Sequence, residues 1–230
     1  MIKIENVVLP SAEQMKAVIR GMRNPMNSWE KSDSEFCSED CENFVHVGEN
    51  DSELMKKLNK AGSAHAKYKR MMWVYCDIVA PMYWWKEWDT YLHTVRNSCS
   101  TMHKIQEKEF TLEDFSCEHL VSEGICFDMP FGEQTIKLFE SPMDGLKFII
   151  GLLNANREVY LKTNDKKYWW QMIQLLPSSY NQRSTVMMNY ETLTAMYRWR
   201  RTHKLDEWQT FCDWIETLPY AELITGGENE

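Results

Sequence analysis

The sequence predicts a single α+β domain that covers residues 1–230. Helical and strand patterns are mixed along the chain without a regular strand–helix–strand alternation, which favours the α+β class over a doubly wound fold. Hydrophobic residues make up 43% of the chain, enough for a globular core. No internal repeat, low-complexity run or linker divides the sequence, so we expect one domain.

The first elements are a strand, a helix and a loop. Residues 2–8 predict a strand that ends before Pro10, and residues 11–14 (Ser-Ala-Glu-Gln) form a capping box that starts a helix. The apolar residues of this helix recur at helical spacing: Met15, Val18, Ile19 and Met22. Residues 21–25 contain glycine and proline and end the helix, and the polar residues 29–43 predict an exposed loop.

The next elements are a second helix and a buried strand. Residues 50–53 (Asn-Asp-Ser-Glu) cap the helix. Residues 73–79 are rich enough in β-branched and aromatic side chains to predict the strand, which Pro81 interrupts. Residues 82–103 then predict a mostly helical segment.

The segment that follows has the least regular pattern. Residues 109–140 predict short helical turns, with strands near residues 124–127 and 134–139. Ser141 followed by proline is typical of a helix start. Residues 158–161 predict a short strand.

The last fifth of the chain carries polar groups on a helical pattern. Residues 168–176 predict a helix that Pro177 ends. A long helical pattern follows, and it contains Asn189, Arg200 and Asp206. The last helix has an apolar face formed by Trp208, Phe211, Ile215 and Leu218.

Composition narrows the class of protein. The net charge of −8 argues against a surface for polymeric nucleic acid, although it leaves room for a local site that binds one small phosphate. No apolar stretch approaches the roughly 20 residues of a membrane helix. The amino terminus lacks a signal-peptide pattern, and the seven cysteines are an odd number, so we expect reduced thiols in a cytoplasmic protein.

Two segments have the chemistry to bind an anion. Residues 97–101 (Asn-Ser-Cys-Ser-Thr) are small hydrogen-bond donors in a turn, which can hold a phosphate or simply cap a helix. Arg200 lies in the densest cluster of positive charge, together with Arg198, Arg201 and His203. A guanidinium there can bind a phosphate or a pyrimidine carbonyl, or it can belong to an ordinary solvated helix face.

The cysteines and histidines do not predict a metal site. Three residues separate Cys37 from Cys41, and Cys117, His119 and Cys126 lie far from them in the sequence. These spacings do not form a matched pair of zinc-binding motifs. We therefore expect no metal ion.

The carboxy-terminal segment resembles that of the flavin-dependent thymidylate synthases. Leu176-Pro177, Asn189 and Arg200 fall into register with the Leu-Pro, Asn/Asp and Arg of that family without a gap. The resemblance spans roughly residues 50–223. It implies a central mixed sheet that is flanked by helices, and it implies that the protein is a homotetramer. It also implies FAD, NADPH and methylenetetrahydrofolate as cofactors of a methyl transfer to dUMP.

The resemblance also implies roles for individual residues. Arg200 matches the arginine that serves the nucleotide, and Arg183 is a weaker candidate on the approach to the same helix. Ser98 fits a family serine, whereas Ser100 replaces an arginine; both are candidates for phosphate binding. Asp206 stands where the family has a glutamine that reads the pyrimidine edge. The two candidates for cofactor binding are His65 and Asn189.

The sequence departs from the family where flavin is held and the base is polarised. Trp-Asp-Thr at residues 88–90 replaces the family's Arg-His-Arg, and Thr210 replaces a late arginine. We therefore assign no catalytic residue and keep two functions open. One is an altered flavin-dependent enzyme that acts on dUMP or a related nucleotide, and the other is a non-catalytic protein that binds or sequesters a nucleotide.

Overall fold

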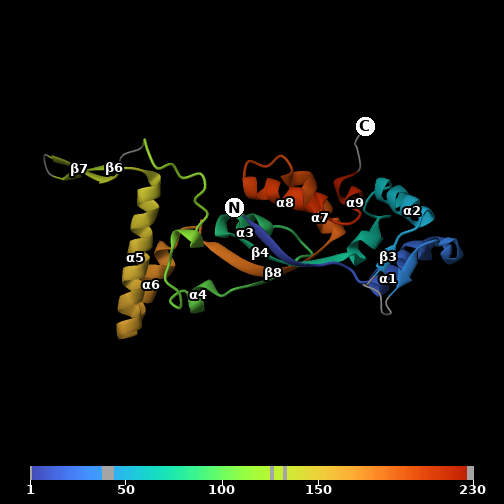
Figure 1. Ribbon diagram of the computed structural model, residues 1–230, viewed down its shortest axis with the longest axis horizontal. Coiled ribbons are helices and arrows are strands. Elements are labelled where there is room, and N and C mark those ends of the chain that lie inside the picture. The colour runs from blue at the N-terminus through green and yellow to red at the C-terminus, as the bar shows by residue number, and fades with distance from the viewer. Residues whose placement is uncertain (1, 38–43, 125–126, 132–133, 227–230) are drawn as a thin grey trace. The chain divides into compact units, whose positions relative to one another are not determined.

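A computed structural model describes residues 2–37, 44–124, 127–131 and 134–226 (Figure 1). The chain packs into two compact units. The described part of unit 1 comprises residues 79–86, 98–124, 127–131 and 134–183, and that of unit 2 comprises residues 2–37, 44–78, 87–97 and 184–226. The expectation of a single domain over residues 1–230 stays a prediction, and each unit is described by itself.

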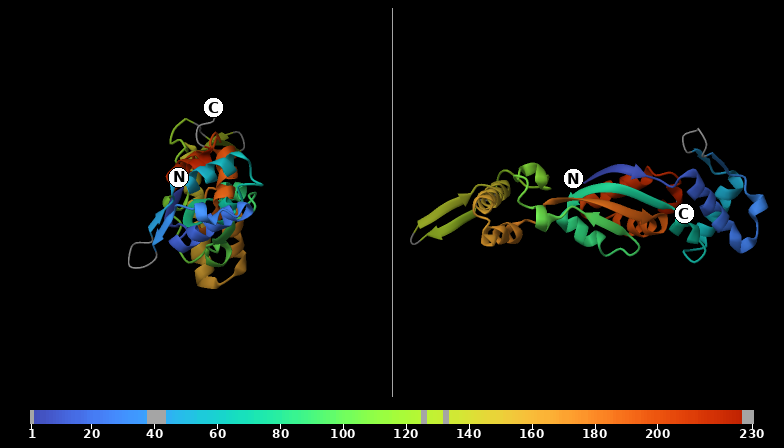
Figure 2. Two further views of the ribbon diagram at one scale, coloured as in Figure 1. Left: turned by 90° about the vertical axis from the view of Figure 1, so that its right-hand side faces the viewer. Right: turned by 90° about the horizontal axis from the view of Figure 1, so that it is seen from below.

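The central sheet has four strands in the order β1-β4-β8-β5. These strands are β1 (Lys3–Val8), β4 (Trp73–Pro81), β8 (Asn181–Asn189) and β5 (Val95–Ser98). Every second residue of β4 is buried, as the two-residue period of a strand with one covered face requires. Ser184, Val186 and Met188 of β8 alternate in the same way. Most of this sheet belongs to unit 2, and helices α7 and α8 lie over one of its faces (Figures 1 and 2).

The helices of unit 2 differ in how they begin, and side chains cap those that follow Ser11 and Asn189. The helices are α1 (Ala12–Arg23), α2 (Glu49–Lys60), α7 (Tyr190–Arg200), α8 (Asp206–Glu216) and α9 (Glu222–Thr225). The helix expected to be capped by residues 50–53 begins instead at Glu49, after Gly48 and without a side-chain cap. The predicted capping box of α1 is present, because Ser11 Oγ accepts a hydrogen bond from Gln14 N and Gln14 Oε1 accepts one from Ser11 N. The apolar face predicted for the last helix is also present, with Trp208, Phe211 and Ile215 fully buried in α8.

Short elements complete unit 2. They are the 3₁₀ turns η1 (Asn24–Met26), η2 (Trp29–Lys31) and η3 (Lys67–Met71), and the antiparallel strands β2 (Glu35–Cys37) and β3 (Phe44–His46). The helix α3 (Met82–Trp88) starts in unit 1 and ends in unit 2.

Unit 1 has its own core between two long helices and a short loop region. Its elements are α4 (Thr101–Lys104), η4 (Leu112–Asp114), β6 (Phe127–Phe131), β7 (Gln134–Phe139), α5 (Pro142–Thr163) and α6 (Lys166–Leu175). Strands β6 and β7 pair in antiparallel fashion. The core residues are Ile105, Phe110, Phe115, Leu146, Ile150, Leu153 and Met172.

Two expected elements differ because tertiary context overrides local pattern. The loop expected over residues 29–43 contains η2 and β2, although residues 38–43 lie outside the described part. The strand expected over residues 158–161 is part of α5, which packs along α6 and buries its own apolar stripe there.

Two helices are shorter in the structure than the sequence predicted. The helix expected over residues 82–103 ends at Trp88, because turns follow and His93 adopts a left-handed conformation (φ 63°) that a helix cannot contain. β5 and α4 occupy the rest of that range. The long helical pattern expected after Pro177 is a strand, β8, up to Asn189, and only then helix α7.

Candidate functional site

Arg200, the last residue of α7, is the centre of a polar cluster within unit 2. Its Nη1 lies 2.6 Å from Glu87 Oε2, and its Nε donates a hydrogen bond of 2.8 Å to the Tyr91 hydroxyl. Glu87 lies in the last turn of α3, and Tyr91 is the third residue after the end of that helix. Two elements distant in sequence therefore fix the orientation of one guanidinium.

Two aromatic rings contact this guanidinium. The central carbon of the Arg200 guanidinium lies 4.7 Å from the Trp208 ring centroid and 5.4 Å from that of Tyr91. Trp208 in turn stacks on Trp88, with centroids 6.4 Å apart and planes 7° from parallel. Cations over ring faces are stabilised by the ring quadrupole, and the planar guanidinium also stacks well. The centroids of the Tyr91 and Trp208 rings lie 6.0 Å apart, so the two rings contact the guanidinium from neighbouring sides and not from opposite ones.

A single carboxylate oxygen, Glu87 Oε2, gathers the donors of the cluster. It accepts a hydrogen bond of 2.8 Å from Trp208 Nε1, in addition to that from Arg200. His203 Nε2 lies 3.4 Å from the same oxygen. His203 Nδ1 accepts a hydrogen bond from Leu205 N, so the proton of the neutral imidazole lies on Nε2, facing Glu87.

Arg200 keeps donors for a ligand. A guanidinium carries five N–H donors, and the described residues accept hydrogen bonds only from its Nε and Nη1. Nη2 therefore keeps two N–H groups, and the side chain is 16% exposed. The cluster, defined here as Glu87, Tyr91, Arg200, His203 and Trp208, can present one oriented donor pair to a phosphate oxygen or a base carbonyl.

The other residues predicted to bind phosphate lie in unit 1. Ser98 is half-buried at the end of β5, and Ser100 caps α4 by accepting a hydrogen bond of 3.1 Å from His103 N. The backbone N–H of Cys99 donates to the carbonyl of Arg183, whose side chain is exposed. The structure thus places the serine turn beside the Arg183 backbone, and phosphate binding there stays a prediction.

The remaining predicted residues lie in unit 2 but outside the Arg200 cluster. Asp206 is exposed at the first position of α8, where a carboxylate also stabilises the helix dipole. Asn189 is buried and caps α7, since its Oδ1 accepts hydrogen bonds from the backbone N and the hydroxyl of Thr192. His65 is exposed in the turn after α2. Their roles toward base and cofactor stay predictions.

A cavity of about 340 Å³ runs beside the His65 turn within unit 2. Gly62 and Ser63 line it from the turn, and Glu191 lines it from α7. Lys69 also lines it, and its Nζ donates to Asn59 Oδ1 and the Leu223 carbonyl. Burial lowers the pKa of Lys69 to about 8, and Glu191, 4.0 Å away, opposes that shift.

Sequence reasoning missed Glu87, Tyr91 and Trp208. Glu87 and Tyr91 are close together in the sequence, but their partner Arg200 is 113 and 109 positions further along the chain. No local pattern reveals such a pairing. Within the described ranges, no three His, Cys, Asp or Glu side chains gather as metal ligands. No described helix is long and apolar enough to cross a membrane.

Comparisons with known proteins give the fold. No family model matches this chain, and no curated protein matches its sequence. The structure is similar to thymidylate synthase X (ThyX) from Helicobacter pylori with FAD and dUMP, with a TM-score of 0.63 and 14% identity over 98% of this chain and 97% of that one. It is also similar to the UMP/dUMP methylase PolB from Streptomyces cacaoi bound with 5-Br dUMP, with a TM-score of 0.55 and 16% identity over 98% and 93% of the chains.

These likenesses confirm the predicted fold. The chain has the α+β fold of flavin-dependent thymidylate synthase, with a sheet flanked by helices, over nearly its whole length. Identities of 14% and 16% establish architecture and leave function to the residues of the site.

Proposed function

We propose that this chain binds a pyrimidine nucleotide, with Arg200 as a main contact. The observation that carries the proposal is the geometry of the Arg200 guanidinium, which Glu87 and Tyr91 orient while Nη2 keeps its donors. A preorganised donor pair loses little entropy when it binds an oxygen acceptor. The solved neighbours with dUMP or 5-Br dUMP support a pyrimidine nucleotide as the ligand.

Asp206 bears on which pyrimidine base the protein would bind. An ionised carboxylate accepts hydrogen bonds and cannot donate them, so it suits a base edge that carries an amino group. The imide edge of uracil offers two carbonyls beside its single N–H. We therefore propose that a cytosine nucleotide competes with dUMP if Asp206 contacts the base.

A second candidate function is flavin-dependent one-carbon transfer to the same nucleotide, favoured by the neighbour solved with FAD and dUMP. Bound flavin would supply hydride, with NADPH as its reductant and methylenetetrahydrofolate as carbon donor. The residues present fit flavin poorly. Thr90 donates its hydroxyl to the Glu87 carbonyl, and Asn189 Oδ1 is occupied by Thr192. We derive no catalytic step, and we expect little or no dTMP from dUMP.

Titration calorimetry with dUMP, UMP and dCMP tests nucleotide binding. A hydrogen bond to a charged group contributes about 1.5–3 kcal/mol, so Arg200→Ala should weaken binding about tenfold or more. Arg201→Ala is the matched control, because Arg201 is the next residue and pairs with Asp213 and Glu216 instead. Equal nucleotide affinity of the wild type and Arg200→Ala, with both proteins folded, would refute the assignment.

The absorbance spectrum of the purified protein separates the two candidate functions. A flavin spectrum, with dTMP formed from dUMP, would establish the enzyme. A colourless protein that copurifies with a nucleotide identified by mass would establish the binding protein. Robust dTMP synthesis would show that the chain compensates for the missing Arg-His-Arg.

We also propose that the chain forms a homotetramer. The family resemblance supports it, as do the ten Trp and fifteen Met residues, which exceed the needs of one small core. Light scattering at micromolar concentration measures the mass directly. The mass of a single 27.4 kDa chain would refute the proposal.

A further inference from the structure

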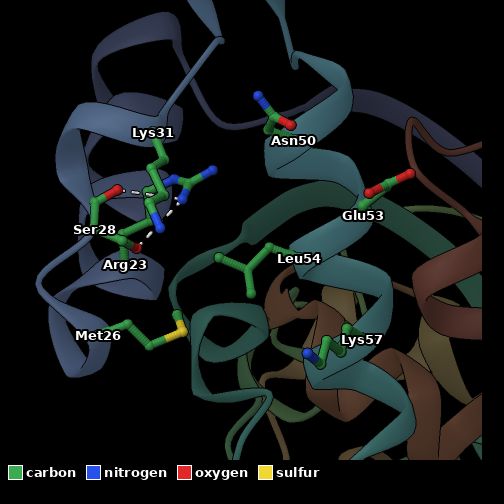
Figure 3. A pocket seen from close by; sticks show the side chains of 8 residues that line it. All are labelled: Arg23, Met26, Ser28, Lys31, Asn50, Glu53, Leu54 and Lys57. Atoms are coloured by element: carbon green, nitrogen blue, oxygen red, sulfur yellow. Dashed lines mark hydrogen bonds between the residues drawn. The ribbon is translucent and has the colours of Figure 1, made fainter.

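A second cavity of unit 2 has the character of an anion site. It encloses about 670 Å³ between the segment that leaves α1 and the outer face of α2 (Figure 3). That volume lies within the usual range for small-molecule sites. No residue of the Arg200 cluster lines this cavity. We propose that it binds a phosphate monoester whose organic part is apolar, at a site separate from that of the proposed nucleotide.

Arg23 forms the rigid part of this site. Its side chain is only 4% exposed, its Nε lies 2.5 Å from Asp51 Oδ1, and its Nη1 donates to the carbonyl and hydroxyl of Ser28. Asp51 is itself held by hydrogen bonds from the hydroxyls of Ser32 and Ser34. Nη2 donates no hydrogen bond within the described ranges, and Figure 3 shows one end of the guanidinium directed away from Ser28, toward Asn50.

Two exposed cations complete the charge of the site. Lys31 and Lys57 are exposed and line the cavity from opposite sides (Figure 3). Glu53 is the acidic member of the lining, and Figure 3 shows its carboxylate directed away from both lysines. Because Asp51 neutralises Arg23, the two lysines and Glu53 leave the lining with one net positive charge close to a fixed donor. Such a set suits a dianion better than a monoanion.

Helix α2 does not supply its amino terminus to this site. The backbone N–H groups of Asn50 and Asp51 already donate to the Asp33 carboxylate. The anion is therefore recognised by side chains. The walls of the cavity also include the apolar side chains of Met26 and Leu54, which would contact the organic part of the ligand.

Phenyl phosphate is a suitable probe, with phenol as its uncharged counterpart. Protein labelled with ¹³C at the methionine methyl groups reports on Met26, whose resonance is assigned by its loss in Met26→Leu. Met26 lines this cavity and is not part of the proposed nucleotide site, so its resonance reports binding at this cavity. Phenyl phosphate should shift the Met26 resonance saturably, and phenol should leave it unchanged.

Variants that remove lysine charges test whether the cavity binds the phosphate group. Lys31→Ala/Lys57→Ala should weaken phenyl phosphate binding at least tenfold. Lys56→Ala/Lys60→Ala is the matched control, since it removes two exposed lysines that do not line the cavity and should bind as before. Binding should also weaken from pH 7.5 to 5, because a phosphate monoester loses its second charge near pH 6. Equal loss in both double variants, or equal shifts with phenol, would overturn the proposal, as would no shift with either compound.

Discussion

Replacing Asp51 by alanine tests the buried ion pair that joins α1 to α2. Asp51 has no exposed surface, and Arg23, its partner, is buried almost as completely. Asp51→Ala removes the acceptor of Arg23 Nε and of the Ser32 and Ser34 hydroxyls. The variant therefore leaves a buried guanidinium without its counter-charge and two hydroxyls without their acceptor.

The expected loss in the free energy of unfolding is about 3–5 kcal/mol, the usual cost of removing one partner of a buried pair. For a chain of this size, 1 kcal/mol corresponds to roughly 2–4 °C in melting temperature, so unit 2 should melt roughly 6–20 °C lower. Most of this loss comes from stranding Arg23. The double variant Arg23→Met/Asp51→Leu, which replaces both charges by apolar groups of similar volume, should therefore recover much of it.

Thermal melting, with hydrogen exchange of peptides from α1 and α2, measures the effect where it arises. Local exchange is the better readout because a chain with two units need not unfold in one step. If Asp51→Ala melts within about 2 °C of the wild type, the pair does not carry the stability assigned to it. If the double variant is as unstable as Asp51→Ala, the destabilisation comes from lost packing and not from the unpaired charge of Arg23.

Two further variants test other parts of unit 2. Lys69→Met should change how the free energy of unfolding depends on pH. Burial lowers the pKa of Lys69 from 10.5 to about 8 in the folded protein, so between about pH 8 and pH 10 the unfolded chain binds more protons than the folded one. The wild type should therefore gain stability as the pH rises through this range. If urea unfolding gives the wild type and Lys69→Met the same pH dependence of the free energy of unfolding, this pKa is wrong. Asn189→Ala removes the cap of α7 and should cost about 1–2 kcal/mol, and a loss below about 0.5 kcal/mol would show that the cap contributes little.

Local sequence signals predicted the elements whose cause is local. The capping box at Ser11, the start of α5 after Ser141 and the apolar face of α8 all depend on residues within one or two helical turns. The errors came where distant contacts decide. The side chains of residues 158–161 are typical of a strand, but the packing of α5 against α6 keeps this segment helical. The chain before Asn189 forms a strand because β4 and β5 lie on either side of it.

The candidate site was only partly accessible from the sequence. Arg200 was predicted because a short motif resembles a family segment. Its orientation depends on Glu87 and Trp208, and no rule of spacing connects Glu87 with residues more than 100 positions away. The phosphate monoester site proposed around Arg23 was missed for a similar reason. Its members Lys31 and Lys57 lie within two unremarkable polar stretches that only the fold brings together.

Glu87 also bears on which part of a nucleotide Arg200 would bind. Its carboxylate lies 2.6 Å from Arg200 Nη1, so the cluster already contains an anion and offers one donor pair with little net charge. A dianionic phosphate at Nη2 would meet the repulsion of the nearby Glu87 carboxylate. A neutral base carbonyl would form the same hydrogen bond without that repulsion. The proposed contact of Arg200 is therefore the pyrimidine carbonyl, and the phosphate would depend on other cations and donors, of which Arg183 and the Ser98–Ser100 turn are the predicted candidates.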